Sequence, residues 1–376
     1  MKLLFVVNHF GYFVTHRMAI AVEARRLGYD VHVAAPGEPP QEITEAGMSA
    51  YSVPLERGGT HPLRELRGLL ILALLIRRLG PDVVHLVTLK PVLYGGVIAR
   101  MLRVPAVVSA VAGLGSVFTT SGFRSRILRT VVALAYRVAL GHRNQRVMLQ
   151  NTSDRDTLIK SAGLREEKVV MVRGSGVDLT KMPFRKEDSG VPIVAFAARL
   201  LRQKGVEEFV AAARVLLGRS VSARFWLIGD PDPGSPYSIA TEQVEAWAAE
   251  GVVEVLGYRP NVPELYALSH VVTLPSYYGE GLPKTLIEAA ACGRPIVTTD
   301  HPGCRDAIVD GETGLLVPVR NVKALADALQ LLLEEPERRK AMGCAGRELA
   351  EREFTVENVV DVHMEVYRCL HEECDV

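Results

Sequence analysis

The sequence predicts an α/β protein built from two domains, each with a parallel sheet. Its 376 residues exceed one ordinary hydrophobic core and fit two domains of roughly 180 residues each. Short runs rich in Val, Ile and Leu alternate with helix-length segments in both halves, the pattern of strands joined by crossover helices. A hydrophobic fraction of 48% with 23% charged residues is typical of a soluble globular protein, and no apolar run reaches the about 20 residues that span a bilayer.

Residues 1–180 are predicted to form the first domain. The opening strand is apolar for only five residues before a loop, so we interpret it as a core strand and not as a signal peptide. Gly28 suits the end of the first helix, because glycine readily adopts the left-handed conformation that stops a helix. The expected elements are strand 2–7, loop 8–12, helix 15–27, strand 30–35, helix 63–79, strand 82–86, a short helix ending at 103, strand 106–110, helix 122–141, strand 146–150, a helix capped within 151–154, and strand 168–172.

Residues 191–354 are predicted to form the second domain, after a polar linker at 179–190. The order of strands and helices restarts there, although the sequence itself does not repeat. The expected elements are strand 192–197, helix 206–217, strand 223–228, strand 252–256, strand 271–274, helix 283–293, strand 295–299, strand 315–318, helix 322–334, helix 338–353 and a last helix at 355–370.

The first turn of the chain contains Gly11, but no Gly-x-Gly-x-x-Gly sequence surrounds it. The fingerprint of dinucleotide binding is therefore absent, which disfavours a dehydrogenase. A plain tight turn also explains this glycine.

The strongest candidate site lies in the crossover that joins the predicted strands 271–274 and 295–299. Its helix is expected to begin at Pro283, because proline at the first position already has helical φ, and to end at Gly293. The first backbone amides of a helix attract anions, phosphate above all. Here they belong to Leu282, Lys284 and Thr285.

Two glutamates, Glu280 and Glu288, stand eight residues apart around this helix start. The segment Glu-Gly-Leu-Pro-Lys-Thr-Leu-Ile-Glu resembles the E-x7-E signature of the retaining, nucleotide-sugar-dependent glycosyltransferase family 4, whose members have the two-domain GT-B fold. Arg199, Lys204 and the loop at 257–258 stand at matching places, so the resemblance covers most of the chain. A doubly wound protein with two solvated glutamates is the alternative interpretation of this segment.

The resemblance implies two Rossmann-like domains that face each other across a cleft. The second domain would hold the nucleotide sugar and the first the acceptor, with the C-terminal helix 355–376 packing back on the first domain. The opening residues 8–11 and 15–17 resemble bacterial members that extend undecaprenyl-diphosphate-linked sugars for surface polysaccharide or protein glycosylation.

The resemblance also assigns roles to individual residues. The catalytic residues would be Arg199, Lys204 and Glu280, with both cations closing on the donor diphosphate and Glu280 on the donor sugar. Nucleotide-sugar binding is assigned to Gly11, Gly229, Tyr258, Gly281, Leu282, Pro283, Lys284, Thr285 and Glu288, the last of these toward the ribose. Acceptor binding is assigned to His16, Arg17 and Arg124, each of which could instead be an ordinary surface residue.

No metal or cofactor is expected besides the nucleotide-sugar donor, with UDP as the expected nucleotide. The sequence Asp230-Pro-Asp232 has the form of a metal site of another glycosyltransferase fold, but we interpret it as a stiff loop, because the cation pair already does the work of a divalent ion. The loop 111–116 lacks the histidine that many family members use to contact the donor sugar, and backbone amides are our substitute for it.

Charge is divided unequally along the chain. Residues 1–180 contain 23 Lys and Arg against 13 Asp and Glu, whereas the remainder contains 21 against 30. No acidic residue occurs between Asp82 and Asp154, and the arginines there are interleaved with aliphatic residues and not with stacking aromatics. We therefore expect an anionic membrane surface or a lipid-linked diphosphate as partner, and no nucleic acid. Arginines that simply solubilise the helix 122–141 are the alternative.

A cytoplasmic protein, peripheral on the inner face of the cell membrane, is the resulting expectation for location. Five cysteines with no C-x-x-C pair agree with a reducing compartment. The apolar block 69–76 inside helix 63–79 is too short to cross a bilayer, and it could lie on a membrane or pack into the core.

Three other functions stay open. A UDP-sugar 2-epimerase shares the implied fold and needs no acceptor, but epimerases lack the paired-glutamate signature. A glycosyltransferase with a soluble acceptor would share all donor features. A carbohydrate-binding protein without activity is disfavoured, because every charged phosphate-binding position is filled.

Overall fold

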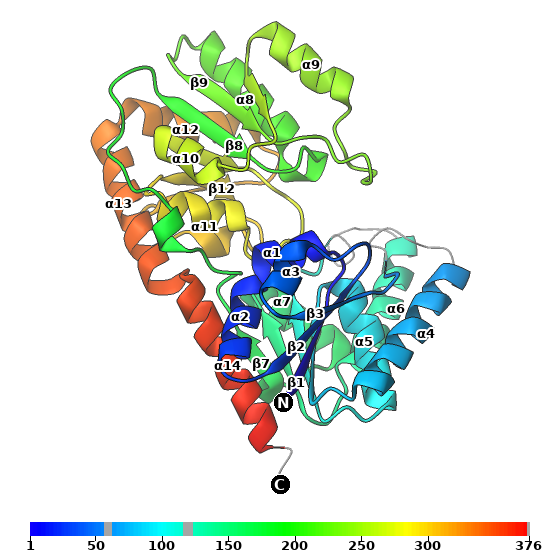
Figure 1. Ribbon diagram of the computed structural model, residues 1–376. Helices are drawn as coiled ribbons and strands as arrows, with labels where there is room; N and C mark the ends of the chain where they lie inside the picture. The colour runs from blue at the N-terminus through cyan, green and yellow to red at the C-terminus, as the bar shows by residue number, and fades with distance from the viewer. Residues whose placement is uncertain (56–61, 116–122, 374–376) are drawn as a thin grey trace. The chain divides into compact units, whose positions relative to one another are not determined.

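The computed structural model describes residues 1–55, 62–115 and 123–373, without the side chains of 62 and 123–127. The chain divides into two compact units (Figure 1). Unit 1 comprises residues 1–175 together with the C-terminal helix, and unit 2 comprises residues 176–355.

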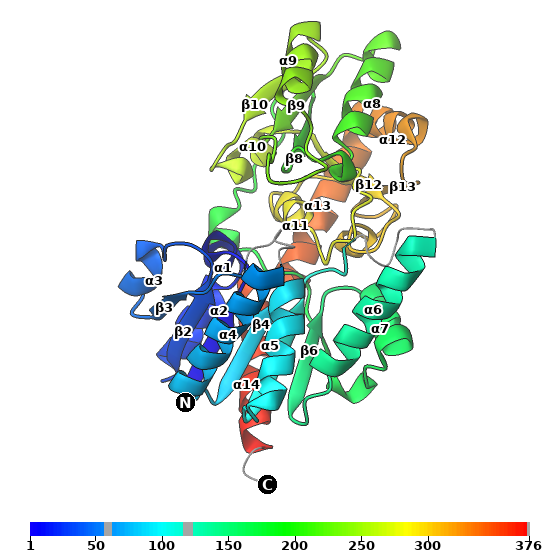
Figure 2. The ribbon, with the colours of Figure 1, turned by 90° about the vertical axis from the view of Figure 1, so that its right-hand side faces the viewer.

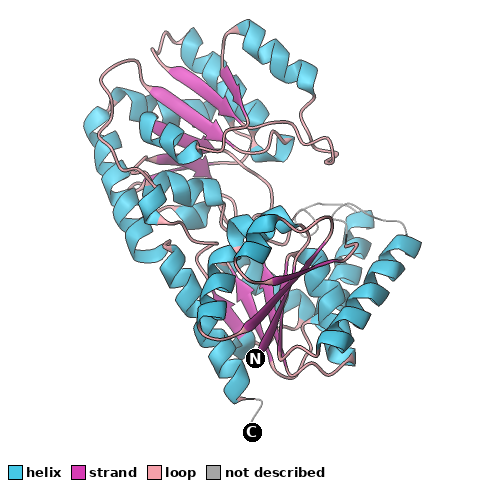
Figure 3. Cartoon of the chain, viewed as in Figure 1, coloured by secondary structure: helices cyan, strands magenta, loops and turns pink. Residues whose placement is uncertain are grey.

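Unit 1 is built on a seven-stranded sheet in the order β3-β2-β1-β4-β5-β6-β7, with every pairing parallel. Its central strands are almost continuously buried, as expected where helices cover both faces of a parallel sheet (Figure 3). The strands are β1 (Lys2–Val6), β2 (Asp30–Ala35), β3 (Ser49–Ser52), β4 (Val83–Val87), β5 (Ala106–Val111), β6 (Gln145–Leu149) and β7 (Val169–Met171).

Two separate hydrophobic cores lie on the two faces of this sheet. One face is covered by α1 (Phe10–His16), α2 (Met18–Arg26) and α14 (Val356–Glu372), and α14 packs along α2. The other face is covered by α4 (Pro62–Leu79), α5 (Leu89–Met101), α6 (Phe123–Ala139) and α7 (Thr152–Ala162) (Figure 2). A short helix, α3 (Gln41–Glu45), precedes β3.

Unit 2 contains a six-stranded parallel sheet in the order β10-β9-β8-β11-β12-β13. Its strands are β8 (Ile193–Ala197), β9 (Arg224–Ile228), β10 (Glu254–Gly257), β11 (Val271–Leu274), β12 (Ile296–Thr299) and β13 (Gly314–Val317). Its helices are α8 (Val206–Gly218), α9 (Thr241–Glu250), α10 (Val262–Leu268), α11 (Lys284–Ala291), α12 (Val322–Glu334) and α13 (Pro336–Glu353).

The predicted single helix over 15–27 is wrong. Two helices occupy this stretch, α1 from Phe10 and α2 from Met18, and Arg17 stands between them with φ −134° and ψ −10°. The earlier start has a local cause, because the His9 imidazole accepts a hydrogen bond from the Gly11 amide and so caps α1. Gly11 consequently lies in the first turn of a helix and not in a loop. Four further elements were not predicted: α3, β3, α9 and α10.

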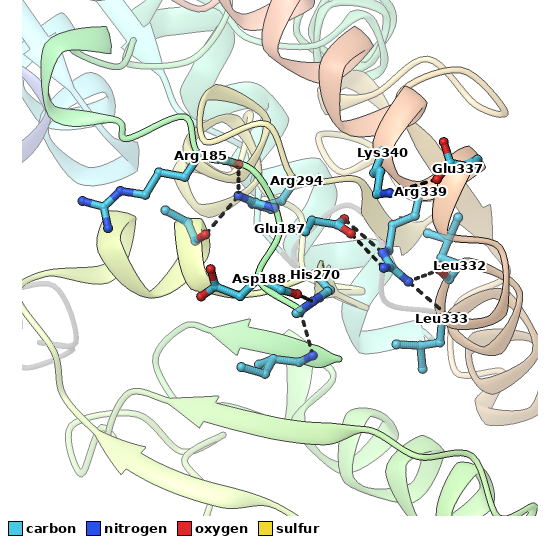
Figure 4. A network of polar contacts seen from close by, with 12 residues as sticks. Arg185, Glu187, Asp188, His270, Arg294, Leu332, Leu333, Glu337, Arg339 and Lys340 are labelled. Carbon is cyan, nitrogen blue, oxygen red and sulfur yellow. Dashed lines mark hydrogen bonds and ion pairs between the residues drawn. The ribbon is translucent and has the colours of Figure 1, made fainter. Parts of the chain in front are cut away.

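The segment predicted as a linker, 179–190, lies in unit 2 and is held there by polar contacts (Figure 4). Arg339 pairs with Glu187 through two hydrogen bonds of 3.0 and 2.8 Å, and both side chains are at most 7% exposed. Arg294 donates to the carbonyl oxygens of Arg185 and Ala267. This part of the chain is therefore an integral part of unit 2.

Candidate active site

The strand order of unit 2 reverses between β8 and β11. The chain leaves β8 through β9 and β10 on one side, and returns through β11 to β12 and β13 on the other. Ligands of open parallel sheets bind at such a switch point, outside the carboxyl ends of the strands. The loops that follow β8 and β11, residues 198–205 and 275–283, carry all three predicted catalytic residues.

Lys204 and Glu280 form an ion pair between these two loops. Lys204 Nζ lies 2.6 Å from Glu280 Oε2, and the side chains are only 14% and 12% exposed. The hydroxyl of Ser276, which is fully buried, lies 2.9 Å from Glu280 Oε1 and 3.2 Å from the carbonyl oxygen of Gln203. Both carboxylate oxygens are thus held, and Ser276 connects the β8 loop to the β11 loop.

Arg199 forms a second ion pair, with Asp232 from the loop after β9. The neighbouring Asp230 accepts a hydrogen bond from the Tyr258 amide at 3.1 Å, and the Tyr258 side chain is exposed. The two carboxylates of the Asp-x-Asp sequence therefore have different partners. Within residues 1–55, 62–115 and 123–373, no three His, Cys, Asp or Glu side chains cluster as metal ligands would.

The start of α11 is attached to the end of β8. The helix begins at Lys284, one residue later than predicted, so Pro283 is its N-cap and not its first residue. The Thr285 hydroxyl donates to the carbonyl of Ala197 at 3.0 Å. The Glu288 carboxylate lies 3.8 Å from Lys284 Nζ. Burial raises the pKa of Glu288, and the positive charge of Lys284 opposes this shift.

Two glycines allow the loops at this edge to approach one another. Gly229 has φ 124°, and a Cβ there would stand 2.0 Å from the carbonyl oxygen of Ala198. Gly303 has φ 85°, and its Cβ would stand 2.1 Å from the carbonyl oxygen of Gly281. A side chain at either position would push apart the loops that carry the ion pairs.

The predicted acceptor residues lie in unit 1. The His16 ring packs edge-on against Tyr12, with ring centroids 4.3 Å apart. Arg17 is only 2% exposed, and its Nη1 donates a hydrogen bond to the carbonyl of His16 at 2.8 Å. The side chain of Arg124 lies outside the described residues, as does Ser116 of the loop 111–116.

Arg17 is buried beside two histidines. It makes no ion pair within the described part of the chain, and its Nε atom has no hydrogen-bond partner there. Burial, His363 and Arg17 lower the pKa of His85, while burial and Arg17 lower the pKa of His363 to about 3. Both rings are therefore neutral at physiological pH, and His85 shares a hydrogen bond with Tyr367 of α14.

Unit 2 thus brings its predicted residues to one edge of one sheet, and Gly11, His16 and Arg17 belong to the other unit. Sequence reasoning missed Ser276 and the pairing of Asp232. Signals for both were present, because Ser276 follows β11 directly and Asp232 stands in a conspicuous Asp-x-Asp sequence. The sequence alone could not show that Ser276 contacts Glu280 or that Asp232 pairs with Arg199.

Two family models match the chain. The model described as "Glycosyl transferase 4-like" matches residues 2–151, and the model described as "Glycosyl transferases group 1" matches residues 179–349.

Similar proteins include an N,N'-diacetylbacillosaminyl-diphospho-undecaprenol alpha-1,3-N-acetylgalactosaminyltransferase from Campylobacter jejuni. It is 29% identical over 88% of this chain and 89% of that enzyme. Among solved structures, sucrose-phosphate synthase from Thermosynechococcus elongatus superposes with a TM-score of 0.82 at 19% identity, over 99% of this chain and all of the other. Anabaena HepE in complex with UDP gives 0.78 at 18% identity, over 99% and 100%. The predicted GT-B fold is confirmed.

Proposed function

Because the chain belongs to the glycosyltransferases of the GT-B fold, we propose the following reaction for it. Its first half matches the glycosyl transferase 4-like model, and its second half matches the model of glycosyl transferases group 1. It transfers a hexosyl or N-acetylhexosaminyl group from a UDP-sugar to a polyprenyl-diphosphate-linked sugar, with retention at the anomeric carbon. The product serves surface glycan or glycoprotein synthesis. The observation that carries this proposal is the meeting of Arg199, Lys204 and Glu280 at the switch point of unit 2.

The donor diphosphate would lie against the two cations and the first turn of α11. An ammonium group has three N–H donors, so Lys204 can keep its bond to Glu280 and still donate to a phosphate oxygen. Glu280, held by Ser276, would accept hydrogen bonds from the donor sugar, and Glu288 from the ribose. The UDP in the HepE complex supports the choice of nucleotide.

Retention follows if the acceptor hydroxyl attacks the anomeric carbon on the face from which the diphosphate leaves. The departing phosphate oxygen then accepts the proton of that hydroxyl. Negative charge develops on the leaving group, where Arg199, Lys204 and the N-terminus of α11 stabilise it. We propose that no metal takes part, so the rate should be the same with and without EDTA.

The acceptor would bind to unit 1, with His16, Arg17 and Arg124 toward its diphosphate. The Campylobacter relative is named for an undecaprenyl-diphosphate acceptor, which supports this class. None of the described helices is long and apolar enough to cross a bilayer. We propose peripheral binding to the cytoplasmic face of the membrane, to which each arginine near an anionic surface contributes roughly 1 kcal/mol.

The test combines donor identification with product analysis. Thermal shifts with UDP, GDP, ADP and dTDP and their sugars identify the donor, because a ligand stabilises in proportion to its occupancy. Transfer is then assayed in detergent with a short-chain polyprenyl-diphosphate sugar, and NMR of the product gives the anomeric configuration. An inverted product would overturn the mechanism. A changed donor sugar in the absence of acceptor would instead identify an epimerase.

A further inference from the structure

Helix α4 has two apolar faces. Its inner face, with Leu72 and Ile76, is buried in the core beneath it. Its outer face carries four leucines at positions i, i+3, i+7 and i+11, a spacing that places them in one stripe opposite the buried residues. These four are between 53% and 72% exposed: Leu63, Leu66, Leu70 and Leu74.

Helix α6 repeats the arrangement. Tyr136 and Ala139 are buried on its inner face. Four aliphatic side chains, between 41% and 60% exposed, run along its outer face: Leu128, Val131, Leu134 and Val138. An amphipathic helix of a globular protein normally turns one apolar stripe to the core, so a second, outward stripe on each helix needs a partner.

The two stripes belong to one layer of unit 1. Both helices pack against α5 and against the same face of the sheet, and Figures 1 and 2 both show α4, α5 and α6 side by side. The outer faces of α4 and α6 therefore belong to the same side of one compact unit.

The rim of this surface is cationic. Arg64 and Arg67 at one end of α4, and Arg77 and Arg78 at the other, are all exposed. The one acidic residue of α4, Glu65, is engaged by Lys90 of α5 at 2.8 Å. Aliphatic stripes edged with arginine match the boundary between acyl chains and anionic headgroups.

The chemistry of the stripes favours lipid over protein as the occupant. Every side chain in them is Leu or Val, with no aromatic ring and no hydrogen-bonding group. Protein interfaces are enriched in Tyr, Trp, Phe and Met at their core, and none of these residues is among the eight described side chains of the two stripes. Acyl chains need no directional contacts, so aliphatic groups suffice.

We propose that the outer faces of α4 and α6 form a bilayer-docking surface, whose leucines and valines enter the headgroup and acyl boundary while the arginines contact anionic headgroups. This inference rests on the proposed function, because a lipid-linked acceptor gives the enzyme a reason to dock on a bilayer. It differs from binding by charge alone in one measurable respect, since apolar insertion persists when salt screens the charges.

The experiment is flotation with vesicles of phosphatidylcholine and phosphatidylglycerol, at low salt and at 1 M salt. The full chain is compared with a Leu66→Gln, Leu70→Gln, Leu74→Gln variant. A matched control, Val22→Gln with Leu27→Gln, changes a side chain of α2 and the C-cap of that helix, which are 47% and 50% exposed on the opposite face of the sheet. All the substituted positions are at or near half exposure, and unchanged melting temperatures verify that the variants fold.

We expect the natural chain and the control to keep part of their binding at high salt. The α4 variant should bind about tenfold more weakly than the natural chain at either salt concentration, a loss of about 1.4 kcal/mol, because the stripe on α6 stays intact. Equal flotation of the natural chain and the α4 variant at both salts would overturn the docking surface. So would sedimentation showing a dimer that the α4 substitutions convert to a monomer, since the stripe would then be covered by a second copy.

Transfer to the lipid-linked acceptor in detergent, where no bilayer is present, separates this inference from the proposed function. Intact transfer in detergent by a variant that floats more weakly supports both. Absent transfer by a natural chain that floats through the α4 stripe overturns the function and leaves the docking surface in place.

Discussion

The two units share one architecture but hold their cations in opposite ways. In unit 2, Arg199 and Lys204 at the strand ends each have a carboxylate partner within the same unit. In unit 1, Arg17 is buried at the break between α1 and α2, makes no ion pair among the described residues and has two neutral histidines beside it. Both cations of unit 2 are thus held by carboxylates of the same unit, whereas unit 1 contains a buried positive charge with which an anion could pair.

This difference has an energetic side. A buried charge that loses its partner costs several kcal/mol, so Glu280 both positions Lys204 and stabilises it before donor binds, whereas the more exposed pair of Arg199 with Asp232 contributes less. Among the described residues no carboxylate pairs with Arg17, so an anionic ligand would gain an attraction that needs no rearrangement of an existing pair. We infer that the donor adds to cations that carboxylates already hold in place, whereas the acceptor diphosphate would give the buried charge of Arg17 its counter-ion.

The largest expected effect concerns Lys204. In a Lys204→Ala enzyme, charge on the leaving diphosphate loses a stabilising contact, which typically costs about a hundredfold in rate. Steady-state kinetics with saturating donor and acceptor measures this, and an unchanged kcat would remove the catalytic role.

A matched control separates catalysis from the loss of an ion pair. Arg339→Met breaks the equally buried pair with Glu187, on the segment after β7, away from the β8 and β11 loops. We expect that control to lose roughly 3–5 kcal/mol of stability and to keep its kcat at temperatures where it is folded.

Ser276 gives the second effect, through Glu280. Replacing Ser276 by Ala removes the hydroxyl that holds Glu280 Oε1 and leaves Lys204 in place. A hydrogen bond to a charged group contributes about 1.5–3 kcal/mol, so we expect kcat to fall at least tenfold while the KM for donor changes little. A rise in donor KM with constant kcat would show instead that Ser276 shapes the ground-state site.

The third prediction tests the buried arginine. Arg17→Met keeps the length of the side chain and removes its charge, so the KM for acceptor should rise about tenfold while the KM for donor stays constant. The melting temperature should not fall, because an apolar side chain replaces a buried charge that has no ion-pair partner. Lower stability with unchanged acceptor KM would assign Arg17 to the core alone.

Several elements of both units were predicted from local signals, and strand Asp30–Ala35 of unit 1 agrees residue for residue. The element boundaries Val271–Leu274 and Val322–Glu334 agree residue for residue, because a continuous aliphatic run and a capping Asn321 are local signals. The break between α1 and α2 at Arg17 is not marked in the sequence by a proline or a glycine. Arg17 lies beside His85 and His363, which come from distant parts of the chain, so no local pattern shows what surrounds it.

The candidate site shows the same limit. The eight-residue spacing of Glu280 and Glu288 is readable from sequence, but the pairing of Glu280 with Lys204 joins residues 76 positions apart. Likewise the apolar block of α4 is visible in the composition, yet only packing decides which leucines are covered and which face solvent. Local signals place the elements, and the side-chain partners follow from the topology of the sheet.

The smallest effect is expected from Glu288→Gln, which should weaken donor binding without lowering the stability of the fold. Because burial raises the pKa of this carboxyl above that of the unfolded chain, ionised Glu288 destabilises the fold at neutral pH, and this penalty disappears as pH falls through the folded pKa. Glu288→Gln removes the charge, so the melting temperature of the variant at neutral pH should equal or exceed that of the natural chain, with a smaller difference in acid.

Donor binding should change in the opposite direction. A neutral amide accepts a hydrogen bond from a ribose hydroxyl less strongly than a carboxylate does, so donor affinity should fall several-fold. As pH falls, Glu288 of the natural chain becomes protonated and donor binding should weaken. Because burial raises the pKa of Glu288, this weakening should begin at a higher pH than it would for an exposed glutamate, and it should be absent in the variant. Calorimetric titration of UDP across the acid range measures both, and identical pH profiles for the two proteins would remove Glu288 from the ribose site.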